Sequence, residues 1–112
     1  MVQTETSDEA YAEDTPLTYL FGTPARTKIV GALVSETDHD LNTSDIARLA
    51  GVARSTVYDH LDELEALGLV EETRTVGGSP MYQLDTDDEL VEHIARIEGL
   101  VLKRLLELEG QL

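Results

Sequence analysis

In this strongly acidic chain, two segments that lie in an expected helix crossing and an expected hairpin contain no carboxylate. The first runs from Ile46 to Tyr58 and carries two arginines and three hydroxyl side chains; the second runs from Thr73 to Leu84 and carries Arg74. Arginine can bond guanine through two N–H groups, hydroxyls bond phosphates or bases, and a helix N-terminus attracts phosphate. A nucleic acid could therefore approach these two surfaces, although a helix crossing and a hairpin are also places where acids are rarer.

No other residues have the spacing of a reactive site. Cysteine is absent, which removes disulfides, thiolate metal sites and thiol redox switches. His39, His60 and His93 lie in three different expected elements without paired ligand spacing, so we expect no metal site. The sequence has no nucleophile elbow, phosphate loop or zinc-hydrolase motif. We expect a protein that is not an enzyme and uses no cofactor beyond K⁺, Na⁺ or Cl⁻ ions bound at high salt.

The excess of acidic residues indicates the salt concentration around the protein rather than the chemistry of its binding partner. The 112 residues include 23 Asp and Glu against 8 Lys and Arg, a formal net charge of −15. DNA-binding domains usually carry a basic excess, so composition alone argues against nucleic acid. A carboxylate-rich surface is, however, favoured at molar salt, where self-repulsion is screened. We interpret the acidity as adaptation to molar salt in the cytosol of a salt-loving microbe. The alternative is an acidic surface that binds a specific basic partner.

Length and hydropathy indicate one small soluble domain. A chain of 112 residues has room for little more than a single domain, and a partner subunit would add buried surface. No apolar run approaches the roughly 20 residues of a membrane span. The N-terminus is acidic and lacks the apolar core of a signal peptide. We therefore expect a cytoplasmic protein without a membrane partner.

Caps and apolar periodicity define the elements that would position the acid-free segments. Leu17, Leu20 and Phe21 have helical spacing before Gly22 breaks the run. Three helices follow, from Thr23 to about Val34, from Asn42 or Thr43 to about Ala50, and from Arg54 to Leu67. Two strands, 69–76 and 80–84, are joined at Gly77-Gly78, which suits a hairpin turn.

The last expected helix opens at Asp87 and Asp88, runs to about Glu109 and carries an apolar seam. Its apolar residues recur every three or four positions, close to a heptad pattern. One small domain cannot easily cover this seam, so we expect a dimer interface, although the helix could also pack on its own domain. The expected interface residues are Leu90, Ile94, Ile97, Val101, Leu105 and Leu108. Gly99 interrupts the helix, either for close approach of a second helix or as a tolerated bend.

Three residues at fixed spacing predict a helix-turn-helix. Ala47 is small where two helices cross, Gly51 can adopt positive φ in the turn, and Val57 is an apolar plug beyond it. The stretches LNTSDIARLAGVARSTVYDHLDELEALGLVEE and TRTVGGSPMYQL resemble winged helix-turn-helix regulators of the MarR, ArsR and PadR type, and GTPARTKIVGAL resembles the first helix of haloarchaeal members. The resemblance covers roughly residues 17 to 110.

This resemblance implies a homodimer that binds double-stranded operator DNA, with the third helix in the major groove and the hairpin wing at the minor groove. Ala53 departs from the pattern because a Ser or Thr usually caps the recognition helix, and Asp59 and Asp62 stand where many relatives carry basic residues. The residues expected to bind DNA are Thr43, Ser44, Arg48, Arg54, Ser55, Thr56, Tyr58, His60, Arg74, Gly77, Gly78 and Ser79.

We therefore expect a mainly α fold with a small β hairpin (α+β). An acidic flexible tail would occupy residues 1–15, a winged helix-turn-helix DNA-binding domain 16–86, and a C-terminal dimerisation helix 87–112. The favoured function is a sequence-specific transcriptional regulator adapted to high salt, and a role in stress responses is among those that the resemblance implies. The alternatives are a winged-helix module that docks a protein and a ligand-sensing repressor.

Overall fold

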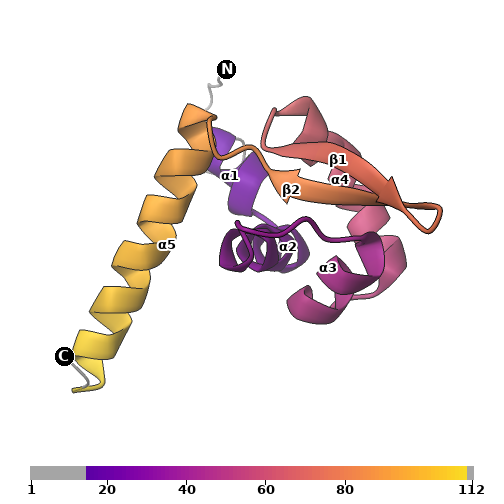
Figure 1. Cartoon of the computed structure of the whole chain (residues 1–112). Coiled ribbons are helices and arrows are strands. Elements are labelled where there is room, and N and C mark those ends of the chain that lie inside the picture. Colours follow the sequence, from indigo (N-terminus) through magenta and orange to yellow (C-terminus); the bar gives the residue numbers. More distant parts are fainter. Residues whose placement is uncertain (1–14, 111–112) are drawn as a thin grey trace.

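The computed structural model describes residues 15–110 as five helices and one hairpin (Figure 1). The chain order is α1 (Pro16–Phe21), α2 (Pro24–Ser35), α3 (Thr43–Ala50), α4 (Arg54–Ala66), β1 (Val70–Val76), β2 (Ser79–Leu84) and α5 (Glu89–Leu108). The expected fold class, mainly helical with a small hairpin and a long last helix, is confirmed. The apolar run ending at Gly22 forms α1, a separate short helix. The acidic segment 1–14 and Leu112 lie outside the described residues.

Side-chain caps fix where the helices begin. Thr15 and Thr23 cap α1 and α2, each followed by a proline in the first turn. Asn42 caps α3 through a capping box, in which its side chain accepts from the Asp45 N–H and the Asp45 carboxylate accepts from the Asn42 N–H. Ala53 begins α4 without any side-chain cap bond, as the sequence predicted.

The core lies between α2, α3, α4 and the inner face of the hairpin. Its fully buried side chains are aliphatic, and each contributes about 1.5–3 kcal/mol through removal from water. They are Ile29, Leu33, Ile46, Val57, Leu64 and Leu69. This cluster fixes α4 against α3, so that the outward surface of α4 has a defined position.

The hairpin is a two-stranded antiparallel sheet with one irregularity. The register passes from Glu72 opposite Tyr82 to Arg74 opposite Met81, which leaves Thr73 as an extra residue in β1. A bulge of this kind bends a strand and redirects its side chains. Gly77 and Gly78 both have positive φ in the turn, as the hairpin prediction requires. Leu41, just before α3, pairs with Tyr82 and continues the sheet by one bridge.

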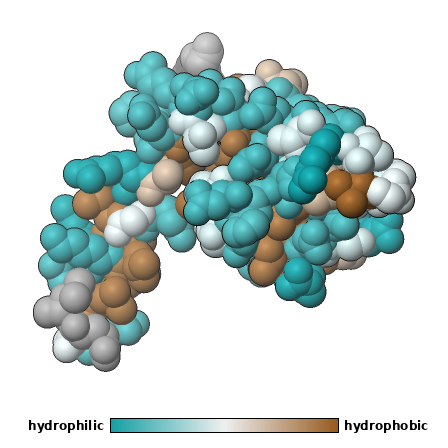
Figure 2. Space-filling model, in the orientation of Figure 1, coloured by the Kyte–Doolittle hydropathy of each residue, from teal (hydrophilic) through white to brown (hydrophobic). Residues whose placement is uncertain are grey.

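Helix α5 leaves the domain after its first turns (Figure 1). Val91 and Ile94 are buried in the same core cluster as α2 and α4. Ile94, one of the expected interface residues, thus packs in the core of its own subunit, and its place in a dimer interface stays a prediction. Farther along, Ile97, Val101 and Leu105 are each half exposed, and Figure 2 shows hydrophobic side chains gathered on the projecting part of the helix. Among the described residues, no helix is long and apolar enough to cross a membrane.

Candidate nucleic-acid interface

The crossing of α3 and α4 has the geometry that the sequence predicted. Ala47 and Val57 are buried where the two helices meet. Gly51 is left-handed, with φ 71°, and its N–H donates to the Ala47 carbonyl at 2.9 Å. Because a residue with a Cβ rarely adopts this conformation, glycine ends α3 at the position where the chain must turn into α4. After this turn, α4 packs Val57 into the core and exposes its first two residues, Arg54 and Ser55.

The first turns of α4 present a polar surface to solvent. Arg54 and Ser55 are exposed, Thr56 is half-buried, and Tyr58 is 51% exposed although it is aromatic. Without a cap on Ala53, the first backbone N–H groups of α4 remain open to an anion. Four expected contact residues thus lie on one helix end, with hydrogen-bond donors suited to phosphates and base edges.

A hydrogen-bonded cluster holds Tyr58 at this surface. Its hydroxyl lies 3.1 Å from the Thr43 hydroxyl and accepts from the Arg54 guanidinium at 3.4 Å. The bond to Thr43, followed by the bond from Arg54, lowers the pKa of Tyr58 from its ordinary value. Thr43 itself is buried and bonded to Tyr58, and a direct contact of Thr43 with DNA stays a prediction.

The exposed surface of α3 adds Ser44 and Arg48. Arg48 donates to Asp45 at 3.4 Å across one turn of the helix, and both side chains remain accessible. This exposed pair is worth little to stability, so its guanidinium can exchange partners at small cost. Both α3 residues therefore remain candidates for contact with a phosphate backbone.

His60 is half-buried and hydrogen-bonded within the domain, and its contact with a phosphate stays a prediction. The Nδ1 atom of His60 accepts a hydrogen bond from Nε of Arg26 at 3.1 Å. Arg26 is buried, donates also to Glu63 and to the Tyr19 carbonyl, and lies 4.9 Å from the centre of the Tyr19 ring. This cluster ties α1 and α2 to α4. Sequence reasoning missed it because its members are far apart in the chain.

In the wing, Arg74 is held by a carboxylate outside the hairpin. Its Nε and Nη2 atoms donate to the two oxygens of Asp40 at 2.8 and 3.0 Å. Thr73 donates its hydroxyl to the same carboxylate at 2.6 Å. The bonds from Arg74 and then Thr73 hold the pKa of Asp40 well below its usual range. At the wing tip, Gly77 and Gly78 are exposed and Ser79 is half-buried.

Carboxylates border the two acid-free surfaces. Asp59 and Asp62 are exposed on α4, and Glu71 and Glu72 are exposed on β1. Of the three arginines on these two acid-free surfaces, Arg48 and Arg74 each bond a carboxylate, whereas Arg54 bonds no carboxylate within residues 15–110. Over the same residues, His, Asp and Glu side chains nowhere gather as a metal site. The arrangement favours directed hydrogen bonds at a few points rather than a broad positive field.

Comparisons with known proteins identify the fold. Residues 32–74, from the end of α2 into β1, match the family model of the IclR helix-turn-helix domain. A comparison with curated proteins gave no match. Among solved structures, the AntR antimony-specific transcriptional repressor is similar at 18% identity and a TM-score of 0.64, over 81% of this chain and 78% of that one.

Two further structures agree in fold. MepR, a transcription regulator of the Staphylococcus aureus multidrug efflux pump MepA, is 23% identical over 86% of this chain and 72% of its own, with a TM-score of 0.61. A homodimeric winged helix-turn-helix DNA-binding domain from Mycobacterium bovis, a possible ArsR-family transcriptional regulator, is 23% identical over 81% and 79%, with a TM-score of 0.58. The predicted winged helix-turn-helix fold, which is that of these transcriptional regulators, is confirmed.

Proposed function

We propose that this winged helix-turn-helix chain is a sequence-specific DNA-binding transcriptional regulator that acts as a homodimer. One observation carries the proposal: the first five residues of α4, Arg54 to Tyr58, include no carboxylate and expose Arg54, Ser55 and Tyr58. The whole chain averages one acid in about five residues. A surface kept free of acids on such a protein suits a polyanionic partner.

In the proposed complex, α4 enters the major groove of DNA. Arg54 at its first position would donate to the O6 and N7 atoms of guanine, while Ser55 and Thr56 bond phosphate oxygens. The wing would lie over the adjacent minor groove, where Arg74 meets the phosphates or the groove edge. Ser44 and Arg48 on α3 would bond the backbone and fix the register of α4.

The proposed dimer forms through the outer part of α5. Within the described chain, most apolar side chains from Ile97 onward are 41–83% exposed, and the part of α5 from Ile97 to Leu108 is about 18 Å long. Leu17 and Leu90 line part of an apolar cavity of about 300 Å³ beside α1. A second copy is the simplest cover for a surface of this length, and the homodimeric state of the Mycobacterium bovis neighbour agrees with that.

Adaptation to high salt belongs to the same proposal. A net charge of −15 repels DNA at long range, and molar KCl screens that repulsion. Cations taken up between Asp59, Asp62 and the phosphates would further lower the free-energy cost of this repulsion. The proposed regulator thus needs salt ions, rather than a cofactor, to bind its operator DNA.

A gel shift with duplex promoter fragments at molar KCl tests this function. We expect Arg54→Ala to weaken binding by about 1–3 kcal/mol and to relax sequence preference. Lys28→Ala, which removes an exposed cation from α2, is the matched control and should bind like the wild type. Equal operator affinity in the wild type and Arg54→Ala would contradict the role of α4 and favour a protein-docking surface.

A further inference from the structure

The carboxylate of Asp40 gathers the two polar residues at the wing bulge. It accepts two hydrogen bonds from Arg74 and one from Thr73. Consecutive residues of a regular strand point to opposite faces, so the bulge at Thr73 is what lets both reach one acceptor. The Asp40 side chain is only 12% exposed, whereas that of Arg74 is 64% exposed. The acid is thus built into the fold while the base faces outward.

Three residues farther along, the same segment reaches the recognition helix. The hydroxyl of buried Thr43 is bonded to that of Tyr58, which in turn accepts from Arg54. Between the two ends, Leu41 exchanges two backbone hydrogen bonds with Tyr82, at 2.7 and 2.8 Å, and Asn42 caps α3. Every residue from Asp40 to Thr43 is therefore bonded to the sheet or to a helix.

We propose that the segment 40–43 is a strut that sets the spacing between the wing arginine and the recognition helix, with Asp40 as the positioning residue for Arg74. The proposal rests on the proposed DNA-binding function. One end of the strut orients Arg74 and the other supports Tyr58 and Arg54. Two cations that would meet DNA at separate points are thereby held in one fixed register.

Asp40 leaves Arg74 able to bind a second group. The guanidinium has N–H groups beyond the two that Asp40 accepts, and its side chain remains mostly accessible. A planar guanidinium fixed on one edge by a carboxylate can donate from its other edge with little further loss of side-chain freedom. A DNA phosphate or an acceptor at the groove edge fits that remaining edge.

The strut makes a prediction opposite to that of simple electrostatics. Removing a negative charge from a protein of charge −15 should improve binding to a polyanion. If Asp40 positions Arg74, however, its removal should weaken binding, because the arginine loses its orientation. Asp38 is the matched control, since it is an exposed acid in the same loop.

The test compares Asp40→Asn, Asp38→Asn and Arg74→Lys in the full chain, with folding checked by circular dichroism. The probe is the duplex that the wild type enriches from a random-sequence pool. We expect Asp40→Asn to weaken its binding about 3- to 30-fold, Asp38→Asn to bind at least as tightly as the wild type, and Asp40→Asn to add no further loss in an Arg74→Ala background. Arg74→Lys keeps the charge but not the paired geometry, so it should lose affinity as Asp40→Asn does.

Three results would overturn the proposed role of the strut. If Asp40→Asn binds as tightly as Asp38→Asn, the carboxylate does not position the arginine. If Arg74→Lys matches the wild type, charge alone accounts for the wing. Because Asp40→Asn could also shift the fold, it is repeated in the Arg74→Ala background, where an equally large further loss of affinity would not act through Arg74 and would overturn the strut as well. Failure of the wild type to enrich any duplex contradicts the DNA-binding function itself, and the strut falls with it.

Discussion

At the scale of single residues, the polar side chains of the candidate interface are held in place before any partner binds. Arg74 is paired with Asp40, Tyr58 is bonded to Thr43, and Arg54 reaches the same tyrosine hydroxyl. Side chains that are already ordered lose less freedom when they bind. For an acidic protein with few cations, such preorganisation can replace part of the missing charge attraction.

The pairing of Asp40 predicts a specific acid sensitivity. Its pKa is lowered in the folded protein by Arg74 and Thr73, so its contribution to stability is present above the unfolded pKa of about 3.9 and is lost as pH falls through the folded pKa. We expect Asp40→Asn to be less stable than the wild type near pH 6, with the difference shrinking below about pH 4. Urea denaturation at constant KCl, with Asp38→Asn as control, measures this. A difference that stays constant from pH 6 to pH 2 would contradict the pairing.

The sequence could not predict the partners of several single residues. Arg26 lies 34 residues from His60 and 37 from Glu63, so no local pattern indicates that they meet. From the sequence alone, His60 is expected to contact a phosphate, and its bond to Arg26 is not foreseen. Thr43 has a hydroxyl suited to DNA, but the burial that turns it toward Tyr58 arises only when α3 and α4 pack together. The spacing of residues in the sequence predicts on which face of a helix each residue lies, but it does not predict contacts with residues far away in the chain.

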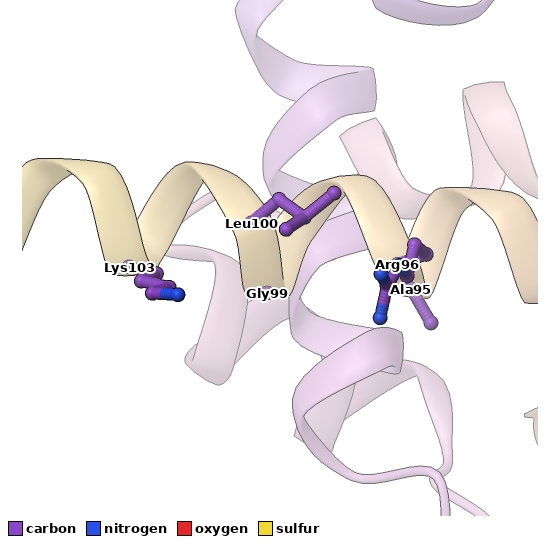
Figure 3. Close-up of a pocket in the computed structure, with 5 residues that line it drawn as sticks. All are labelled: Ala95, Arg96, Gly99, Leu100 and Lys103. Atoms are coloured by element: carbon purple, nitrogen blue, oxygen red, sulfur yellow. The ribbon is translucent and has the colours of Figure 1, made fainter.

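At the scale of elements, α5 has two parts with different roles. Val91 and Ile94 belong to the domain core, whereas the side chains from Ile97 to Leu108 cover no part of it. Gly99 lies in a shallow hollow of α5 together with Ala95, Arg96, Leu100 and Lys103 (Figure 3). At about 100° per residue, Gly99 is on the opposite side of the helix from Ile97 and Val101. A tolerated glycine thus fits its position better than close approach along the seam.

We expect truncation after Arg96 to give a folded monomer that binds operator DNA weakly, because it removes the proposed interface but keeps Val91 and Ile94. Analytical ultracentrifugation with circular dichroism measures both properties. As a control, Gly99→Ala should keep the dimer and stabilise α5 by up to about 1 kcal/mol, since an added Cβ meets no atom within 4 Å. A truncated chain that still sediments as a dimer would show that the interface lies elsewhere.

The elements themselves were predictable because their ends carry local signals. These signals act within one turn of the chain, and each begins or ends a helix as expected. They are Thr23-Pro24 for α2, and Asn42 with Asp45 and Gly51 for α3. The separation of Ile94 from the exposed seam was not predictable, because an apolar heptad pattern does not distinguish packing on a partner from packing on the domain. The bulge at Thr73 was not predictable either, and the carboxylate that the Thr73 hydroxyl bonds, Asp40, lies 33 residues away.

At the scale of the whole molecule, the net charge of −15 opposes binding to a polyanion, and few cations on the proposed DNA-binding face offset it. The proposed face offers Arg48, Arg54 and Arg74 per subunit, and two of these are already paired with carboxylates. Few phosphates can therefore be neutralised, so little counterion release accompanies binding. In the proposed complex, exposed Asp59 and Asp62 would instead require cations to be taken up as DNA approaches.

We predict that operator affinity stays flat or rises as KCl increases from low to molar concentration. The folded state should also gain stability with salt, because screening relieves its self-repulsion. Fluorescence anisotropy with labelled duplex measures affinity, and circular dichroism at each concentration separates binding from folding. A steep loss of affinity with rising KCl, in protein that stays folded, would falsify the proposed salt adaptation of the interface.

Selection of duplexes from a random-sequence pool at molar KCl tests the central claim most directly. A homodimer with one α4 per subunit should enrich a motif with two-fold symmetry, whose half-sites are about 10–10.5 base pairs apart or a multiple of that. Arg54→Ala, carried through the same selection, should lose preference at one position in each half-site. Recovery of no motif by folded wild-type protein would contradict DNA recognition by this fold.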